Sequence, residues 1–217
     1  MTHKKSELSL FLLICLLITS TSNSLVMMET TANPAHKQEL LHDLQRATGL
    51  WLDVRKDFVR ENPVAFNLIP FSLLTTKKWS LTARFLLLGA LRSNSVYRVH
   101  TFRDRKLGSS GAGIDLNLND LKSVTYRNVP REAFGAGLIF LHELAHSHRG
   151  LVDPDLLEGR SNPEVKGPTV EYINKIQREL GLPERLHYFP KKIPGRSDVL
   201  CIYFGTVERV ELDPKLF

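Results

Sequence analysis

The chain has 217 residues, of which 42% are hydrophobic and 24% charged, with a formal net charge of +6. These values are close to those of an average globular protein, so they exclude a collagen-like, low-complexity or disordered chain. The positive charge is not gathered into a dense run of Lys and Arg. It therefore indicates an ordinary basic surface, and we expect no nucleic-acid partner.

The N-terminus has the pattern of a secretory signal peptide. Lys4 and Lys5 precede an apolar run at 8–18, and small polar residues follow up to Ser24. The apolar run is shorter than the roughly 20 residues that a membrane-spanning helix needs. We therefore expect a secreted or periplasmic protein with no stable membrane association after cleavage at residues 1–24. An uncleaved anchor is the competing interpretation.

The rest of the N-terminal part is expected to be largely helical. Apolar spacing predicts helix over most of 35–61, with Gly49 as a break, and a second helix over 79–91. We expect this region, 25–94, to pack with a catalytic region at 95–217 into one compact domain. Only Cys201 remains outside the signal, in an apolar stretch, which favours a buried core thiol and allows no intrachain disulfide.

In the middle of the chain, the spacing of apolar residues changes from a helical period to an alternating one. Residues 95–102 and 113–118 alternate polar with apolar side chains, which predicts strands, and the second of these is a candidate edge strand for binding extended peptide. Helical spacing returns at 130–148 and 168–180, and Gly150 and Gly181 are suited to the positions just past the two helix ends. This order predicts an α+β fold with a small sheet rather than a parallel α/β fold.

The segment from His142 to His146 reads His-Glu-Leu-Ala-His within a predicted helix. Positions four apart lie one turn above each other, so both imidazoles can bind one Zn²⁺ ion at about 2.0–2.1 Å. Glu143 then lies beside the ion, where it can take a proton from water. His148 faces about 200° away from His146 on the helix and is not expected to bind the same ion.

A catalytic zinc site usually has three protein ligands, so one more is needed. Val152 stands where an extended version of the motif would place a third histidine, and a downstream carboxylate is therefore expected. Glu171 is predicted to face solvent, whereas Glu164 lies in a loop that can aim it at the ion. Glu164 is favoured, and the remaining candidates stay open: Asp153, Asp155, Glu158 and Glu171.

Three segments resemble the NleD-type effector metalloproteases and related bacterial toxin domains. They are the His142–His146 motif, the stretch at 163–170 and the stretch at 174–188 that ends in Arg185-Leu-His-Tyr188. The resemblance covers about residues 95–190. It implies a zincin-like fold with an edge strand over the cleft, a glutamate before a Thr-Val step as third ligand, and an Arg and a Tyr that line the active site.

On this sequence the implied third ligand maps to Glu164 and the implied pair to Arg185 and Tyr188. The chain departs from the family pattern, because Glu164 is five residues before Thr169 and Glu171 replaces a glycine. A phenol and a guanidinium are suitable donors to the oxygen that becomes negative during peptide hydrolysis. Without the resemblance, the alternative interpretation is that Tyr188 is a half-buried aromatic residue and that Arg185 is a charged surface residue.

The sequence therefore predicts a monomeric, exported zinc endopeptidase with one Zn²⁺ per chain, which acts on a protein or peptide substrate. The resemblance to effectors also allows delivery into a target cell. His142, His146 and Glu164 would bind the metal, Glu143 would act as base, and Tyr188 with Arg185 would stabilise the oxyanion. Two alternatives remain open: an inactive, zinc-stabilised binding module, and a basic secreted interaction protein without metal.

Overall fold

The computed structural model of the chain describes residues 25–28, 34–55, 58–61, 78–93, 95–101, 108–110, 113–155, 159 and 161–214. The predicted signal segment, 1–24, and the candidate ligand Glu158 lie outside these residues. Within the described ranges, no helix is long and apolar enough to cross a membrane.

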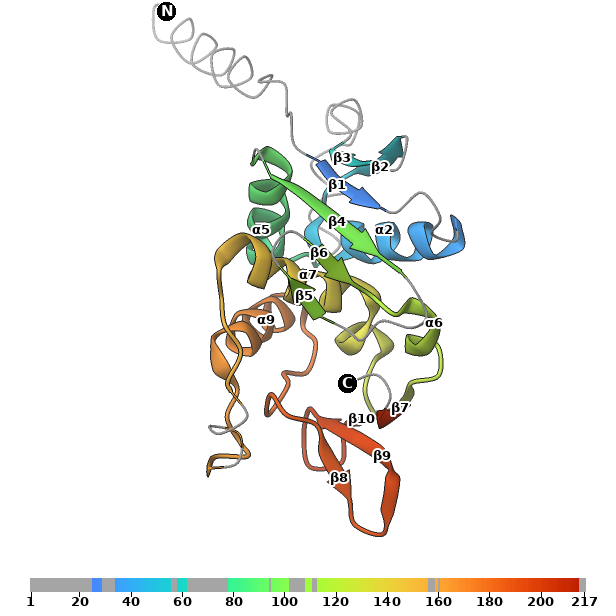
Figure 1. The fold of residues 1–217 in the computed structure, drawn as a ribbon, viewed down its shortest axis with the longest axis vertical. Helices are drawn as coiled ribbons and strands as arrows, with labels where there is room; N and C mark the ends of the chain where they lie inside the picture. The colour runs from blue at the N-terminus through green and yellow to red at the C-terminus, as the bar shows by residue number, and fades with distance from the viewer. Residues whose placement is uncertain are drawn as a thin grey trace, which may run out of the picture.

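A mixed six-stranded sheet forms one layer of the fold (Figure 1). Its strands, in spatial order, are β2 (Leu52–Arg55), β3 (Phe58–Glu61), β1 (Leu25–Met28), β4 (Val96–His100), β6 (Gly113–Asp115) and β5 (Gly108–Ser110). The pairs β1–β4 and β4–β6 are parallel, and the other pairs are antiparallel. Together with the helices described next, this sheet confirms the α+β prediction.

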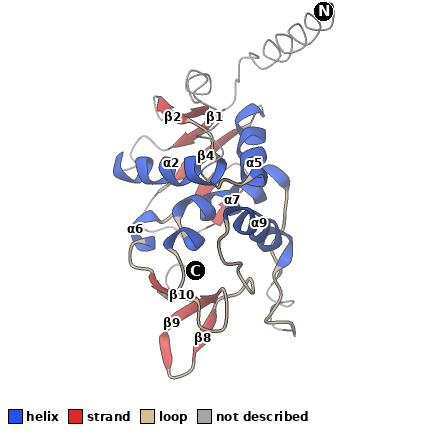
Figure 2. Cartoon of the chain, turned by 180° about the vertical axis from the view of Figure 1, so that it is seen from behind, coloured by secondary structure: helices blue, strands red, loops and turns tan. Residues whose placement is uncertain are grey.

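Helices lie on one face of this sheet, as the view from behind shows (Figure 2). They are α2 (Pro34–Thr48), α5 (Leu81–Arg92) and α7 (Ala136–Arg149), and α9 (Gly167–Leu180) packs against α5 and α7. The short α6 (Leu118–Leu121) and the 3₁₀ helix η1 (Arg131–Phe134) precede α7. Phe140, Leu141 and Leu144 of α7 are fully buried, so this helix lies at the centre of the core.

The N-terminal region is less helical than its sequence predicts. The helix α2 ends at Thr48, and Gly49 adopts a left-handed conformation with φ 64°. Beyond it, β2 and β3 pair as an antiparallel hairpin instead of continuing the helix. A left-handed glycine stops a helix because it turns the chain away from the helix axis, and the alternating Leu52 and Val54 then suit a strand.

The edge of the sheet is also placed differently from the prediction. Residues 113–115 form β6, which pairs on both sides and is therefore an internal strand. The neighbouring segment β5, where no strand was predicted, is the edge strand on this side of the sheet, and it packs against α7.

A second, antiparallel sheet lies at the bottom of the molecule in Figure 1, at the end opposite the strands β1, β2 and β3. It has the order β7 (Thr125–Arg127), β10 (Arg209–Leu212), β9 (Arg196–Tyr203) and β8 (Lys191–Ile193). Ile202 and Val210 are fully buried in the common core. Cys201 is fully buried as well, which confirms its prediction as a core thiol.

Candidate metal centre

The helix that carries the motif receives its N-terminal cap from another helix. Its own N-cap residue, Gly135, has no side chain, but Asp43 of α2 accepts a hydrogen bond from the N–H of Gly137 at 3.3 Å. A Cβ atom at position 137 would lie 2.7 Å from the Cβ of Asp43, so only glycine allows this approach. Burial raises the pKa of Asp43. The contact fixes α7 against α2 at the end opposite the metal motif.

At its other end, α7 stops at Gly150. This residue is left-handed, with φ 65°, and its N–H bonds to the carbonyl oxygens of Ala145 and His146. The sharp turn directs residues 151–153 back along the last turn of the helix, because a left-handed residue reverses the chain direction. The structure thereby places Asp153 beside the motif.

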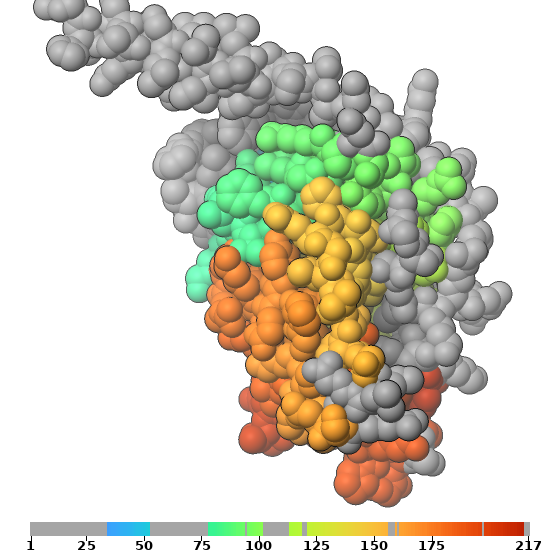
Figure 3. Space-filling model, turned by 60° about the vertical axis from the view of Figure 1, so that its left-hand side comes forward, coloured from blue at the N-terminus to red at the C-terminus, as the bar shows by residue number. Residues whose placement is uncertain are grey.

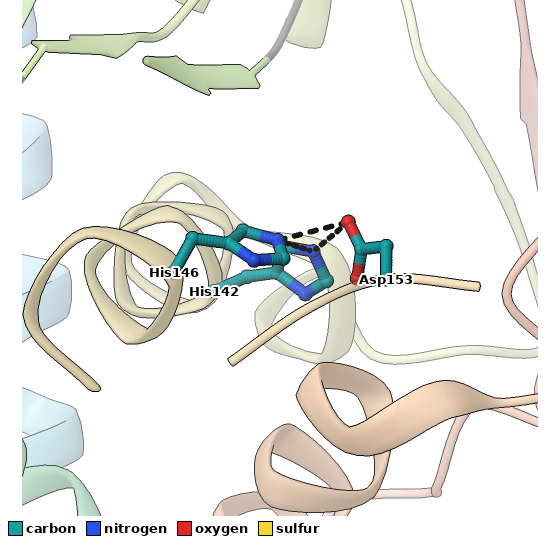
Figure 4. Close-up of side chains that lie close together, drawn as sticks. All are labelled: His142, His146 and Asp153. Carbon is teal, nitrogen blue, oxygen red and sulfur yellow. Dashed lines mark hydrogen bonds and ion pairs between the residues drawn. The ribbon is translucent and has the colours of Figure 1, made fainter. Parts of the chain in front are cut away.

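His142, His146 and Asp153 converge (Figure 4). The Nε2 atoms of the two histidines lie 3.1 Å apart, and Oδ2 of Asp153 lies 2.9 Å from Nε2 of His146 and 3.7 Å from Nε2 of His142. Donors that bind one zinc ion tetrahedrally at about 2.0–2.1 Å lie about 3.3 Å from each other. The three donor atoms therefore have the spacing of a metal site with little rearrangement.

The loop that carries Asp153 also orients His146. Nδ1 of His146 lies 2.6 Å from the carbonyl oxygen of Leu151, which can only accept a hydrogen bond. This contact assigns the proton to Nδ1 and leaves the lone pair of Nε2 for a metal ion. Thr169, at the start of α9, donates to the carbonyl oxygen of Val152 at 3.2 Å and so holds the same loop.

Electrostatics link the ligands to one another. Burial alone would raise the pKa of Asp153, but hydrogen bonds from His142, His146 and Tyr188 hold it well below its usual range. Burial alone would lower the pKa of His146, but its bonds to Asp153 and Leu151 outweigh burial and raise it. The carboxylate is thus ionised at neutral pH and ready to bind a cation.

Glu143 faces a cavity next to the ligands. Its side chain is buried, and it lines the cavity together with His142. The cavity has a volume of about 290 Å³ and lies between α7, α9 and the segment at 185–190. Its other lining residues are mostly apolar: Ala133, Phe134, Leu138, Ile139, Val170, Ile173, Asn174, Gln177, Arg185, Tyr188, Phe189, Pro190 and Phe204. A carboxylate in this position can serve as a base for a group bound in the cavity.

Arg185 and Tyr188 line the same cavity as His142 and Glu143. The ring of Tyr188 stacks on that of His142, with centroids 6.4 Å apart and planes 22° apart. Burial raises the pKa of Tyr188, so its hydroxyl remains protonated and can donate. Arg185 donates from Nε to the carbonyl oxygen of His187 at 2.8 Å, and a second guanidinium nitrogen donates to that of Tyr188. These bonds brace the segment that carries the phenol.

The structure does not bring Glu164 to the cluster, which corrects the favoured choice of third ligand. The carboxylate of Glu164 pairs with Lys191, and its side chain is 64% exposed. Its backbone N–H bonds to the side chain of Asn162, which keeps it in a surface turn before α9. Glu171 is 57% exposed and lies 3.8 Å from Lys166, so it faces solvent as predicted.

Asp153 was one of the open candidates, and the sequence alone gave no reason to prefer it to the others. Gly150 is the expected residue just past the helix end, and a reversal there brings the next acidic residue over the last helical turn. His148 does not join the cluster, as predicted, because Nδ1 of its ring lies 2.8 Å from the hydroxyl of Tyr97 on the other side of α7.

A scan against protein-family models finds no match to this chain, and neither the curated proteins nor the solved structures yield a significant match.

Proposed function

We propose that the protein is a zinc-dependent endopeptidase with a zincin-like catalytic site. The observation that carries this proposal is the convergence of His142, His146 and Asp153 on one point, with the buried carboxylate of Glu143 next to it. Two imidazoles and one carboxylate are a donor set that catalytic zinc sites use, and they leave a position open for water. The same set also suits Fe(II), but an adjacent buried base favours hydrolysis.

A zinc ion bound to these three residues would act as a Lewis acid and lower the pKa of a coordinated water to about 7. Glu143 would accept a proton from this water as its oxygen forms a bond to the substrate's carbonyl carbon. It would then pass the proton to the amide nitrogen as the C–N bond breaks. The place of Glu143 supports this role, because its side chain is buried directly beside the metal ligands and lines the same cavity as His142.

Tyr188 and Arg185 are the proposed stabilisers of the negative charge that develops on the carbonyl oxygen. Both line the same cavity as Glu143 and His142. Tyr188 offers a protonated hydroxyl, and Arg185 offers a guanidinium whose Nε and one further nitrogen are fixed on backbone carbonyls. Arg185 is held in place before the reaction and so needs no reorganisation, whereas the hydroxyl of Tyr188 would exchange its hydrogen bond to Asp153 for one to the carbonyl oxygen.

The volume and the apolar lining of the cavity indicate which substrate side chain it would bind. A dry cavity of about 150 Å³ lined by Leu, Ile and Phe holds benzene. The cavity here is about 290 Å³ and is lined largely by apolar residues of α7 and α9, among them Leu138, Ile139, Val170 and Ile173. It has room for one large apolar side chain next to the scissile bond. The edge strand β5, which packs against α7, could pair with an extended peptide backbone.

The test is to measure zinc content and cleavage of a peptide library on the same purified protein. The proposal expects one zinc per chain, cleavage next to large apolar residues, and loss of cleavage but not of zinc in the Glu143→Gln variant. Zinc without cleavage of any peptide would instead identify a binding module that the metal stabilises. Absence of bound zinc after loading would reject both.

A further inference from the structure

Helix α9 carries buried polar residues that the proposed chemistry does not use. Thr169 and Asn174 have no exposed surface, although polar side chains are expensive to bury unless they are hydrogen-bonded. Both side chains form hydrogen bonds to the backbone of a segment at the site. Thr169 bonds to the loop that carries Asp153, and Asn174 bonds to the segment that carries Arg185. In Figure 3 the orange surface of α9 lies beside the gold surface of the chain that follows α7.

Thr169 bonds to the metal side of the site. Its Oγ1 donates to the carbonyl oxygen of Val152 at 3.2 Å and lies 3.4 Å from Nδ1 of His146. Val152 directly precedes Asp153, so this bond restrains the loop on which Asp153 is placed. A residue that orients a ligand in this way typically changes metal affinity about 10–100-fold when it is replaced.

Asn174 bonds to the other side of the site, more than one helical turn away from Thr169. Its Nδ2 donates to the carbonyl oxygen of Arg185, and its Oδ1 accepts from the N–H of Arg185, both at 2.9 Å. The amide side chain thus pairs with both backbone polar groups of Arg185, next to the bond from the N–H of Leu186 to the carbonyl oxygen of Tyr203. Three residues further on, Tyr188 donates its own N–H to the carbonyl oxygen of Val165 at 2.7 Å.

We propose that Thr169 and Asn174 are two separate positioning residues: Thr169 sets the place of Asp153, and Asn174 sets the place of Arg185 and Tyr188. The inference rests on the proposed function for the role of Arg185 and Tyr188. The restraint of two separate segments by two side chains of one helix does not depend on whether the protein cleaves peptides.

The experiment compares Thr169→Val and Asn174→Ala in the full-length protein. Each is assayed for zinc affinity by competition with a chelator, for kcat and KM with zinc saturating, and for amide hydrogen exchange at 182–190. Thr169→Val is expected to lower zinc affinity about 10–100-fold without faster exchange at 182–190. Thr169→Ser, which keeps the hydroxyl, is expected to restore most of the affinity.

Asn174→Ala is expected to leave zinc affinity within about twofold and to lower kcat about 100-fold with little change in KM, because a misplacement of about 1 Å has effects of this size. Exchange of the Arg185 amide is expected to become faster, since its acceptor is removed. Asn174→Asp, which keeps an acceptor for that amide, should retain slower exchange than Asn174→Ala.

Glu179→Gln is the matched control on the same helix. Glu179 accepts hydrogen bonds from Ser80 and Thr82 at the N-terminus of α5, so its carboxylate is bound to α5 and not to a segment of the metal site. The control is expected to lower the melting temperature without changing zinc affinity, kcat or exchange at 182–190.

Equal losses of zinc affinity in Thr169→Val and Asn174→Ala would overturn the division of roles, and so would an effect of Glu179→Gln on the same readouts. A wild-type protein that cleaves nothing would reject the proposed function, while zinc affinity and amide exchange would still decide the positioning roles. If either variant fails to fold, Thr169→Ser and Asn174→Asp supply the same comparisons with smaller expected effects.

Discussion

Both ring nitrogens of His146 are contacted by the loop that follows its helix: Nδ1 by the carbonyl oxygen of Leu151 at 2.6 Å, and Nε2 by the carboxylate of Asp153 at 2.9 Å. The two contacts come from residues two apart in sequence, so the loop fixes the tautomer of the imidazole and supplies a ligand beside it. A metal ion that binds here would replace the contact between Nε2 and Asp153 with two bonds to itself. The contact between His146 and Asp153 therefore holds the two ligands in position before a metal ion binds.

The identity of the third ligand gives the first prediction. Asp153→Asn is expected to lower zinc affinity at least about 100-fold, because an amide oxygen is a neutral and weaker donor than a carboxylate. Glu164→Gln is the matched control and is expected to keep wild-type affinity, since its carboxylate pairs with Lys191 on the surface. Chelator competition measures both. Loss of zinc in Glu164→Gln alone would restore Glu164 as the ligand.

The catalytic base gives the second prediction. Glu143→Gln is nearly isosteric and does not remove a metal ligand, so zinc content is expected to remain at one per chain. Peptide cleavage is expected to fall by about 1,000-fold or more, because general-base catalysis contributes about 10²–10⁴-fold. Cleavage is followed by mass spectrometry on the zinc-loaded protein. Undiminished turnover in this variant would show that Glu143 is not the base.

The phenol of Tyr188 gives the third prediction. Tyr188→Phe keeps the ring that stacks on His142 and removes only the hydroxyl. The loss of one donor to a developing oxyanion lowers kcat about 10²–10³-fold, and we expect a reduction in that range with KM little changed. Steady-state kinetics with an excess of zinc separate the two parameters. A rise in KM with kcat unchanged would place the hydroxyl in substrate binding instead.

The pH dependence of zinc binding gives the fourth prediction. A proton on Nε2 of His146 must leave before zinc binds, and the pKa of His146 is raised, mainly through Asp153 and Leu151 acting against burial. Zinc affinity is therefore expected to fall as the pH drops through this raised pKa, at a higher pH than an ordinary histidine value of about 6.5 would give. In Asp153→Asn the fall should move to lower pH. An identical midpoint in both proteins would contradict the assigned cause.

The cap of α7 gives the fifth prediction. Burial raises the pKa of Asp43 above its unfolded value, so its stabilising contribution is complete below that unfolded value and declines as the pH rises through the folded one. Asp43→Asn keeps an acceptor for the N–H of Gly137 without this penalty. We expect it to match or exceed wild-type stability at pH 7, whereas Asp43→Ala should cost about 1 kcal/mol. Urea unfolding at pH 4 and pH 7 tests both; a marked loss in Asp43→Asn at pH 7 would contradict the prediction.

Some of the fold could be predicted from local pattern alone. The spacing of apolar residues located α5 and α9 to within two residues at each end, and the glycines at 150 and 181 end α7 and α9 in left-handed conformations as expected. The predicted start of α7 was wrong by six residues, because the separate 3₁₀ helix η1 precedes it. The hairpin β2–β3 and the edge strand β5 could not be located in this way. Their strands are short, and strand pairing depends on partners that are distant in sequence.

The sequence by itself determined one half of the metal site, because a helical period places His142 and His146 on the same side of α7 with Glu143 beside them. Only the tertiary structure decided the other half. Five acidic residues at 153–171 were candidates for the remaining ligand, and their distance along the chain does not rank them. The reversal at Gly150 and the bond from Thr169 to Val152 bring Asp153 to the histidines, while Glu164 remains on the surface. The choice depends on how a loop packs against two helices, which no local pattern encodes.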